Sequence, residues 1–263
     1  MINQSLFQAL GTPIHRAYFI MGIIGSLFTF FISFTLLRKY FQKKTTLRLK
    51  AGITIFIFGA ALIIDPIFLS LRAMEVGDWV GLQSNISFGL LAIGNIGLLM
   101  FIREVFYKNE YNWKVYLIIG IEISILPLVL ILHYQGIDTI YVLFIHLLAS
   151  FTIYISQFYQ SIQLGRKMRI EAPENVEGLT AIRYIGLSGI FLLLTYVSFI
   201  MQELVFLLRD VYEKLNIIQE GATIFIPLGF FLAGLSAYLL YVGLILPKWL
   251  RSYLRKRTDK ENL

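Results

Sequence analysis

The chain has 263 residues, of which 57% are hydrophobic and 15% are charged, and its mean hydropathy is +0.73. Soluble domains are typically about 45–50% apolar and about 25% charged, so this composition indicates an integral membrane protein. The chain has no cysteine, which excludes disulfides, thiolate metal sites and iron–sulfur clusters. The net charge of +7 does not indicate nucleic-acid binding, because the basic residues are concentrated in short segments beside apolar runs.

Apolar runs of spanning length define the expected fold. A helix needs about 20 apolar residues to cross the hydrocarbon core of a bilayer. Seven such runs, bounded by charges or turn residues, predict an all-α, seven-helix transmembrane bundle that forms a single domain over residues 1–263. Residues 247–263 follow the last run as a basic tail. The predicted spans are 17–37, 51–71, 82–102, 115–133, 139–159, 182–207 and 222–246.

The charges of the connecting segments predict the orientation. Connections that are rich in lysine and arginine alternate along the chain with neutral or acidic ones. Because cytoplasmic loops carry the excess of basic residues, this alternation predicts an outside amino terminus and a cytoplasmic carboxyl terminus. We therefore expect a multi-pass protein of the cell (cytoplasmic) membrane, with anionic lipid head groups at its basic loops. The basic segments are 38–50, 103–114, 166–169 and 247–257.

Several polar residues fall in the predicted outer half of the membrane. Asp65 lies roughly 21 Å along its span, where an ionised carboxylate is costly unless it faces the bundle interior, is protonated or has a partner. His146 and Glu203 fall at overlapping depths, with Gln202 and Tyr141 nearby. These five residues predict an outward-facing, ligand-binding polar pocket. The alternative is that each makes a separate contact near the outer interface.

A second group of polar residues suggests switch or relay roles. Glu122 lies among apolar residues of the fourth predicted span, and Asn95 lies in the third. A buried carboxylate can relay protons, although an interhelical hydrogen bond is an equally good interpretation. At the inner end of the third span, Arg103 and Glu104 could form a latch to the sixth span, where Arg183 is expected at a matching height. The alternative is that these arginines only anchor the helices at the interface.

The sequence lacks the residues that several known classes of membrane protein and enzyme require. Seven spans with an outside amino terminus are also the outline of microbial rhodopsins and G-protein-coupled receptors, but the last predicted span has no lysine for a retinal Schiff base. The HExxH and GxSxG motifs are absent, and the only histidines are His15, His133 and His146. We therefore expect no enzymatic activity, no bound metal and no cofactor.

These observations favour a receptor or sensor that signals to a separate cytoplasmic protein. A first alternative is a proton-coupled transporter of small solutes that uses Asp65, Glu122 and Glu203 as relay groups. Transporters are commonly built from inverted repeats, which the sequence does not show. A second alternative is a non-catalytic structural or assembly subunit.

Overall fold

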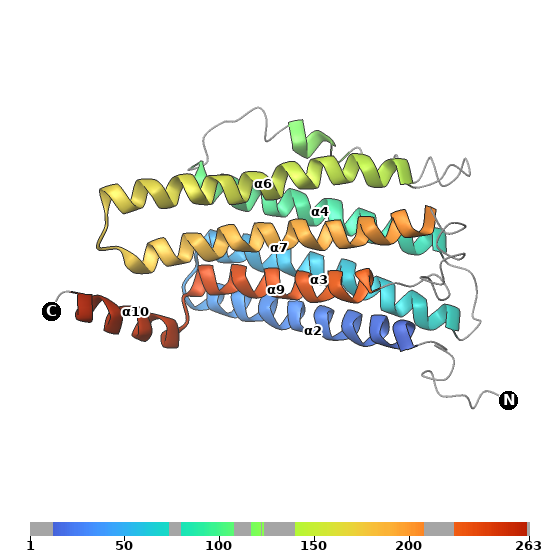
Figure 1. Cartoon of the computed structure of the whole chain (residues 1–263), viewed down its shortest axis with the longest axis horizontal. Helices are drawn as coiled ribbons and strands as arrows, with labels where there is room; N and C mark the ends of the chain where they lie inside the picture. Colours follow the sequence, from blue (N-terminus) through green and yellow to red (C-terminus); the bar gives the residue numbers. More distant parts are fainter. Residues whose placement is uncertain are drawn as a thin grey trace.

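The computed structural model describes residues 13–73, 80–107, 117–121, 123, 140–207 and 224–261. The regular elements within these residues are all α-helices, and the six long ones lie side by side along the longest axis of the molecule (Figure 1). A shorter helix, α10, follows the last of them. The helices are α2 (Pro13–Gln42), α3 (Thr46–Ala73), α4 (Val80–Phe106), α6 (Ile140–Glu171), α7 (Val176–Leu207), α9 (Phe225–Ile245) and α10 (Lys248–Glu261).

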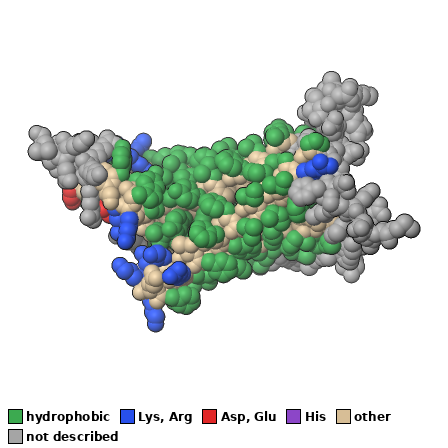
Figure 2. Space-filling model, turned by 90° about the horizontal axis from the view of Figure 1, so that it is seen from below, with side chains coloured by type: hydrophobic (Ala, Val, Ile, Leu, Met, Phe, Trp, Pro, Cys, Tyr) green, Lys and Arg blue, Asp and Glu red, His purple; other side chains and the backbone are tan. Residues whose placement is uncertain are grey.

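Length and apolarity make the chain a multi-pass membrane protein. Among the described residues, α2, α3, α4, α7 and α9 each contain a stretch that is long and apolar enough to cross a membrane. In lipid a helix satisfies every backbone hydrogen bond within its own segment, which explains why apolar runs of this length form helices. Hydrophobic side chains cover the middle of the bundle, whereas lysine and arginine gather mainly towards one end (Figure 2). Side chains such as Phe31 and Leu148, which are 67% and 69% exposed, therefore face lipid.

The six long helices form a closed ring. Each packs mainly against two neighbours, in the order α2, α3, α4, α6, α7 and α9, and α9 in turn packs against α2. The contact between α4 and α6 is the least extensive of these seams within the described residues. The inside of the ring is filled by fully buried side chains, among them Leu36, Phe101, Tyr154 and Phe230.

The two ends of the bundle differ. The turns between α2 and α3 and between α6 and α7, the end of α4, and α10 all lie at one end, which we call the basic end (Figure 1). Helices α2 and α6 begin at the opposite end. At the basic end, Leu246 adopts a left-handed conformation with φ 46° and ψ 81°, and Pro247 follows it. This pair ends α9 and separates it from α10.

Helices α2, α3, α4, α6 and α7 are all longer than their predicted spans, and the difference is most important between α6 and α7. Helix α6 continues to Glu171 beyond the predicted end at residue 159, and α7 begins at Val176 instead of residue 182. Residues 160–181, which lie between the two predicted spans, are therefore mostly helical, because hydropathy marks the limit of the membrane and not the end of a helix. The basic tail likewise contains α10. The predicted span 115–133 lies outside the described residues except for 117–121 and 123, which are helical, so the seven-helix count stays a prediction.

Candidate functional site

Asn95 joins α4 to α6 in the interior of the bundle. Its side chain is fully buried, its Nδ2 donates a hydrogen bond to Ser150 Oγ at 2.8 Å, and its Oδ1 accepts one from Tyr154 OH at 2.7 Å. Ser150 and Tyr154 are four residues apart and therefore share one face of α6. A single amide thus makes two side-chain hydrogen bonds across the least extensive seam of the ring.

His146 extends this contact from α6 to α7. It is fully buried one turn before Ser150, and its Nε2 forms a hydrogen bond of 3.0 Å with Tyr196 OH. The rings of Tyr154 and Tyr196 lie 5.3 Å apart between centroids. We call these five residues, Asn95, His146, Ser150, Tyr154 and Tyr196, the buried network. It connects α4, α6 and α7 at one level of the bundle.

A second group of hydrogen bonds lies nearer the basic end. Gln157 Nε2 donates to the backbone oxygen of Ile185 at 2.7 Å and to Ser188 Oγ at 2.8 Å. Ser236 Oγ of α9 donates to the backbone oxygen of Ser188 at 2.8 Å. Polar contacts therefore continue from α6 through α7 to α9.

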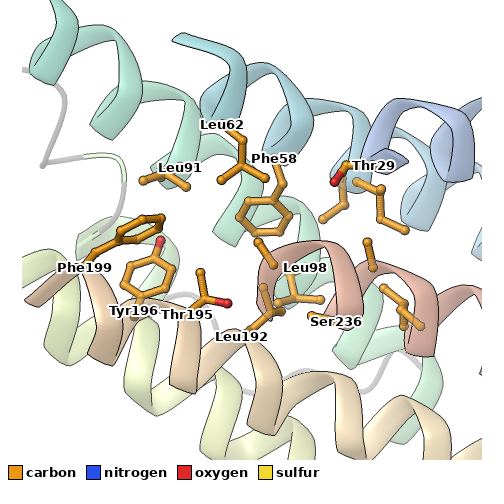
Figure 3. Close-up of a pocket in the computed structure, with 15 residues that line it drawn as sticks. Thr29, Phe58, Leu62, Leu91, Leu98, Leu192, Thr195, Tyr196, Phe199 and Ser236 are labelled. Carbon is orange, nitrogen blue, oxygen red and sulfur yellow. The ribbon is translucent and has the colours of Figure 1, made fainter. Parts of the chain in front are cut away.

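A small cavity lies inside the ring beside the buried network (Figure 3). Its volume is about 40 Å³, and its walls are mainly apolar side chains from α2, α3, α4, α7 and α9. Tyr196 belongs both to this wall and to the network, and Phe199 and Thr195 flank it on α7. Binding sites for drug-sized molecules have roughly 300–1,000 Å³, so this space is too small for such a ligand in the present arrangement. Because the walls are apolar, we interpret it as a dry gap in the packing.

Two predicted pocket residues, Asp65 and His146, each form a hydrogen bond with a neighbouring helix. Asp65 is partly buried, and its Oδ1 accepts a hydrogen bond from Ser87 Oγ of α4 at 3.2 Å. His146 forms its hydrogen bond with Tyr196 of α7. Gln202 is buried on α7, between one and two turns beyond Tyr196 and thus closer to the opposite end.

The remaining members of the predicted pocket are not described. The side chains of Glu203 and Tyr141, and the whole of Glu122, lie outside the described residues. A single pocket around Asp65, His146 and Glu203 therefore stays a prediction.

At the basic end, Glu104 of the predicted latch contacts α3. Glu104 Oε1 accepts a hydrogen bond from Thr46 Oγ1 at 2.6 Å, and Lys50 Nζ lies 2.5 Å from Glu104 Oε2. Both partners belong to α3, whereas Arg183 is exposed on α7. Glu104 therefore contacts α3, which packs along α4, and a contact of Arg103 or Glu104 with the helix of Arg183 stays a prediction.

Sequence reasoning missed most of the buried network although a signal was present. The polar residues of α6 recur at intervals of three or four, which places them on one side of an otherwise apolar helix. A single serine or tyrosine in a membrane span does not by itself indicate a functional site. The spacing of several polar residues along α6 indicates that they share one face, which we call the polar stripe of α6. Its members are His146, Ser150, Tyr154, Gln157 and Ser161, all of them buried.

Comparison with known proteins adds no assignment: no family model, curated protein or solved structure matches the chain. Within the described part of the chain, no group of three or more histidine, aspartate or glutamate residues is placed to hold a metal ion. The site is therefore interpreted from its own geometry.

Proposed function

We propose that the protein is a non-catalytic membrane receptor or sensor whose basic end faces the cytoplasm. One observation carries the proposal: the helix pair that is joined by the buried network also extends well past the end of α4 at the basic end. Gln160 Nε2 of α6 donates to Tyr107 OH, just beyond the end of α4, at 2.8 Å. Helix α6 then runs eleven residues further, to Glu171, which corresponds to roughly 16 Å.

This geometry couples the two ends mechanically. A helix is stiff over this length, so a displacement of α6 or α7 at the level of His146 moves the turn between them at the basic end. The signal is then read by a separate cytoplasmic protein, while anionic lipid head groups contact the basic turn between α2 and α3. The network residues are the natural place for such a displacement, because side-chain hydrogen bonds can exchange partners.

The ligand would bind on the side of the network that faces the opposite end. Asp65 and Gln202 lie on that side, and the predicted pocket residues Glu203 and Tyr141, whose side chains are not described, belong to α7 and α6. A small polar molecule or a lipid head group that contacts these residues would bridge α3, α6 and α7. Binding that favours one position of α7 over another would shift the population between two arrangements.

The cavity supplies space for a second arrangement. A cavity lowers the free energy of unfolding by about 24 cal/mol per Å³, so a cavity of 40 Å³ corresponds to a loss of about 1 kcal/mol. A shift of the α7 side chains Tyr196 and Phe199 into this space would recover part of that energy. The two arrangements can therefore be close in free energy, as a sensor requires.

The absence of native cysteine permits a direct test. Spin labels on Lys43→Cys and Arg169→Cys report the distance between the α2–α3 turn and the tip of α6 in lipid nanodiscs. We expect two distance populations, whose ratio changes when Tyr196→Phe removes the hydroxyl that bonds His146. Thr152→Val, which removes an exposed hydroxyl of the same helix α6, is the matched control and should leave the ratio unchanged. One fixed distance in all variants would contradict the proposal.

A second measurement separates the proposal from proton-coupled transport. Proteoliposomes with a pH gradient are assayed for proton flux with the wild-type protein and with Asp65→Asn. The receptor proposal expects no flux above that of protein-free liposomes. Flux that Asp65→Asn abolishes would favour the transporter instead.

A further inference from the structure

Helix α10 packs one of its sides against the rest of the protein. Leu250 and Leu254 are buried in a cluster with Val176 of α7. Arg251 Nε lies 3.9 Å from Glu177 Oε2, in the first turn of α7. This side of α10 is therefore occupied within the protein, and it fixes α10 to the start of α7.

The level of the membrane boundary at the basic end follows from the contact between α2 and α9. A Cβ on Gly25 of α2 would meet the backbone oxygen of Phe230 of α9 at 3.1 Å, so these two residues are level. The two helices run in the same direction (Figure 1), so Arg38 and Gly243, each thirteen residues further on, are also level. Arg38 is the first charged residue after the apolar stretch of α2. Gly243 therefore marks the edge of the hydrocarbon core on α9.

The first turn of α10 lies within the head-group layer. Helix α9 ends at Ile245, two residues after Gly243. Arg251 Nη2 donates to the backbone oxygen of Ile245 at 2.9 Å, which keeps the start of α10 beside the last turn of α9. The head-group layer is about 5–7 Å thick on each side of the bilayer, so it surrounds this part of α10.

Another side of α10 presents two aromatic rings at this level. Trp249 and Tyr253 are four residues apart, share one side of the helix, and are 58% and 61% exposed. Lys248, which is also exposed, precedes Trp249. Tryptophan and tyrosine are enriched where the bilayer meets water, and lysine is attracted to anionic lipids. The composition of this side is therefore that of a segment in contact with a membrane surface.

We propose that the side of α10 formed by Lys248, Trp249 and Tyr253 binds the head groups of anionic lipids. The two rings would insert among the head groups, while the ammonium group of Lys248 would pair with a lipid phosphate. The inference deepens the proposed function by naming the lipid surface as the partner of α10, and it rests on that function only for placing the basic end in the cytoplasm.

A protein with one tryptophan tests this contact. Trp79→Phe and Trp113→Phe leave Trp249 as the only tryptophan of the full chain. The protein is reconstituted in nanodiscs whose lipids are brominated near the head-group end of the acyl chains, and quenching of Trp249 fluorescence is measured. We expect quenching to increase as phosphatidylglycerol replaces phosphatidylcholine, and to decrease again as salt is raised.

Two substitutions that remove the same charge locate the site. Lys248→Gln should raise the phosphatidylglycerol fraction at half-maximal quenching by about threefold to fivefold, the effect of one cation near an anionic surface. Lys167→Gln should leave it unchanged, because Lys167 lies seven residues, or roughly 10 Å, beyond the Gln160 that contacts Tyr107 past the end of α4.

The aromatic side is tested within α10 itself. Tyr253→Ser removes a ring and should weaken the quenching of Trp249, since the helix then loses part of its contact with the head groups. Ser252→Ala is the matched control, because it changes an exposed side chain of the same turn without altering a ring or a charge.

Three results would overturn the lipid proposal. The first is the absence of quenching in every lipid mixture, which would leave this side of α10 open to a soluble protein. The others are quenching that does not depend on phosphatidylglycerol, and equal effects of Lys248→Gln and Lys167→Gln. None of these measurements requires two arrangements of α6 and α7. A failure here therefore leaves the spin-label and flux tests untouched, and a single spin-label distance would leave the lipid contact untouched.

Discussion

The seams of the ring are held together in two different ways. Along α2, α9 and the basic half of α7, backbones touch at glycines: a Cβ on Gly25 would lie 3.1 Å from the backbone oxygen of Phe230, and one on Gly243 would lie 2.9 Å from that of Ala181. Between α4 and α6, Asn95 and Tyr154 make side-chain hydrogen bonds instead. One region is therefore closely packed, and the other is bonded at discrete points.

The contrast between glycine packing and side-chain hydrogen bonding indicates which of the two regions can move. Association of helices in lipid depends on van der Waals packing, which falls off steeply when backbones separate, so the glycine seams have one favourable arrangement. Hydrogen bonds between side chains can be remade with other partners. Helix α7 takes part in both regions, since Ile185 packs on Gly243 whereas Tyr196 belongs to the buried network. We therefore interpret the region around Ile185 as a pivot.

The largest expected effect tests the packed region. Gly243→Ala places a methyl group against the backbone of Ala181 and Ile185, which cannot rotate away as a side chain could. We expect a loss of about 1–3 kcal/mol in the free energy of unfolding, measured by denaturation in mixed micelles. Gly234→Ala in the same helix is the control, because its Cβ would meet Phe28 at an ordinary 3.5 Å. Equal stability of the two variants would remove the distinction between the seams.

A smaller effect is expected in the hydrogen-bonded region. Asn95→Ala removes two bonds, and interhelical hydrogen bonds in membranes contribute on average about 0.6 kcal/mol each, so the loss should be about 1–2 kcal/mol. A double-mutant cycle with Tyr154→Phe should show coupling, because the two side chains share a bond. The control cycle pairs Asn95→Ala with Thr152→Val, and additivity is expected there. Additive behaviour in both cycles would contradict a network.

Filling the cavity should change stability in the opposite direction. Ala237 lines the cavity on α9, so Ala237→Val adds methyl groups where space exists, with an expected gain of up to about 1 kcal/mol. Ala149→Val is the matched control, because Ala149 is buried but does not line the cavity, and overpacking should destabilise it. The filled variant should also lose one of the two spin-label distances. Destabilisation in both variants would show that the gap cannot accept a side chain.

The sequence predicts the positions of the helices along the chain better than it predicts which side chains meet between helices. Hydropathy predicts helices where α2, α3, α4, α6, α7 and α9 are found, whereas the membrane depth that helix rise gives for Asp65 and His146 stays a prediction. Depth does not give rotation about the helix axis, which explains why Ser87 and Tyr196 were not identified as partners. Rotation is set by packing against neighbouring helices, and a single sequence contains that information only as patterns such as the polar stripe of α6.

The smallest expected effect concerns the ion pair between α3 and α4. Lys50 and Glu104 are partly exposed, with side-chain accessibilities of 38% and 17%, and pairs of this kind typically contribute about 0–1 kcal/mol. Glu104→Gln removes the charge but keeps an oxygen that can accept the hydrogen bond of Thr46. We therefore expect a loss below that of Asn95→Ala, measured by the same denaturation, and a difference from wild type that shrinks as salt is raised. If Glu104→Gln were instead the more damaging change, α4 would be held mainly at the basic end. The buried network would then be a passive part of the core, and the movable seam would have to be sought elsewhere in the ring.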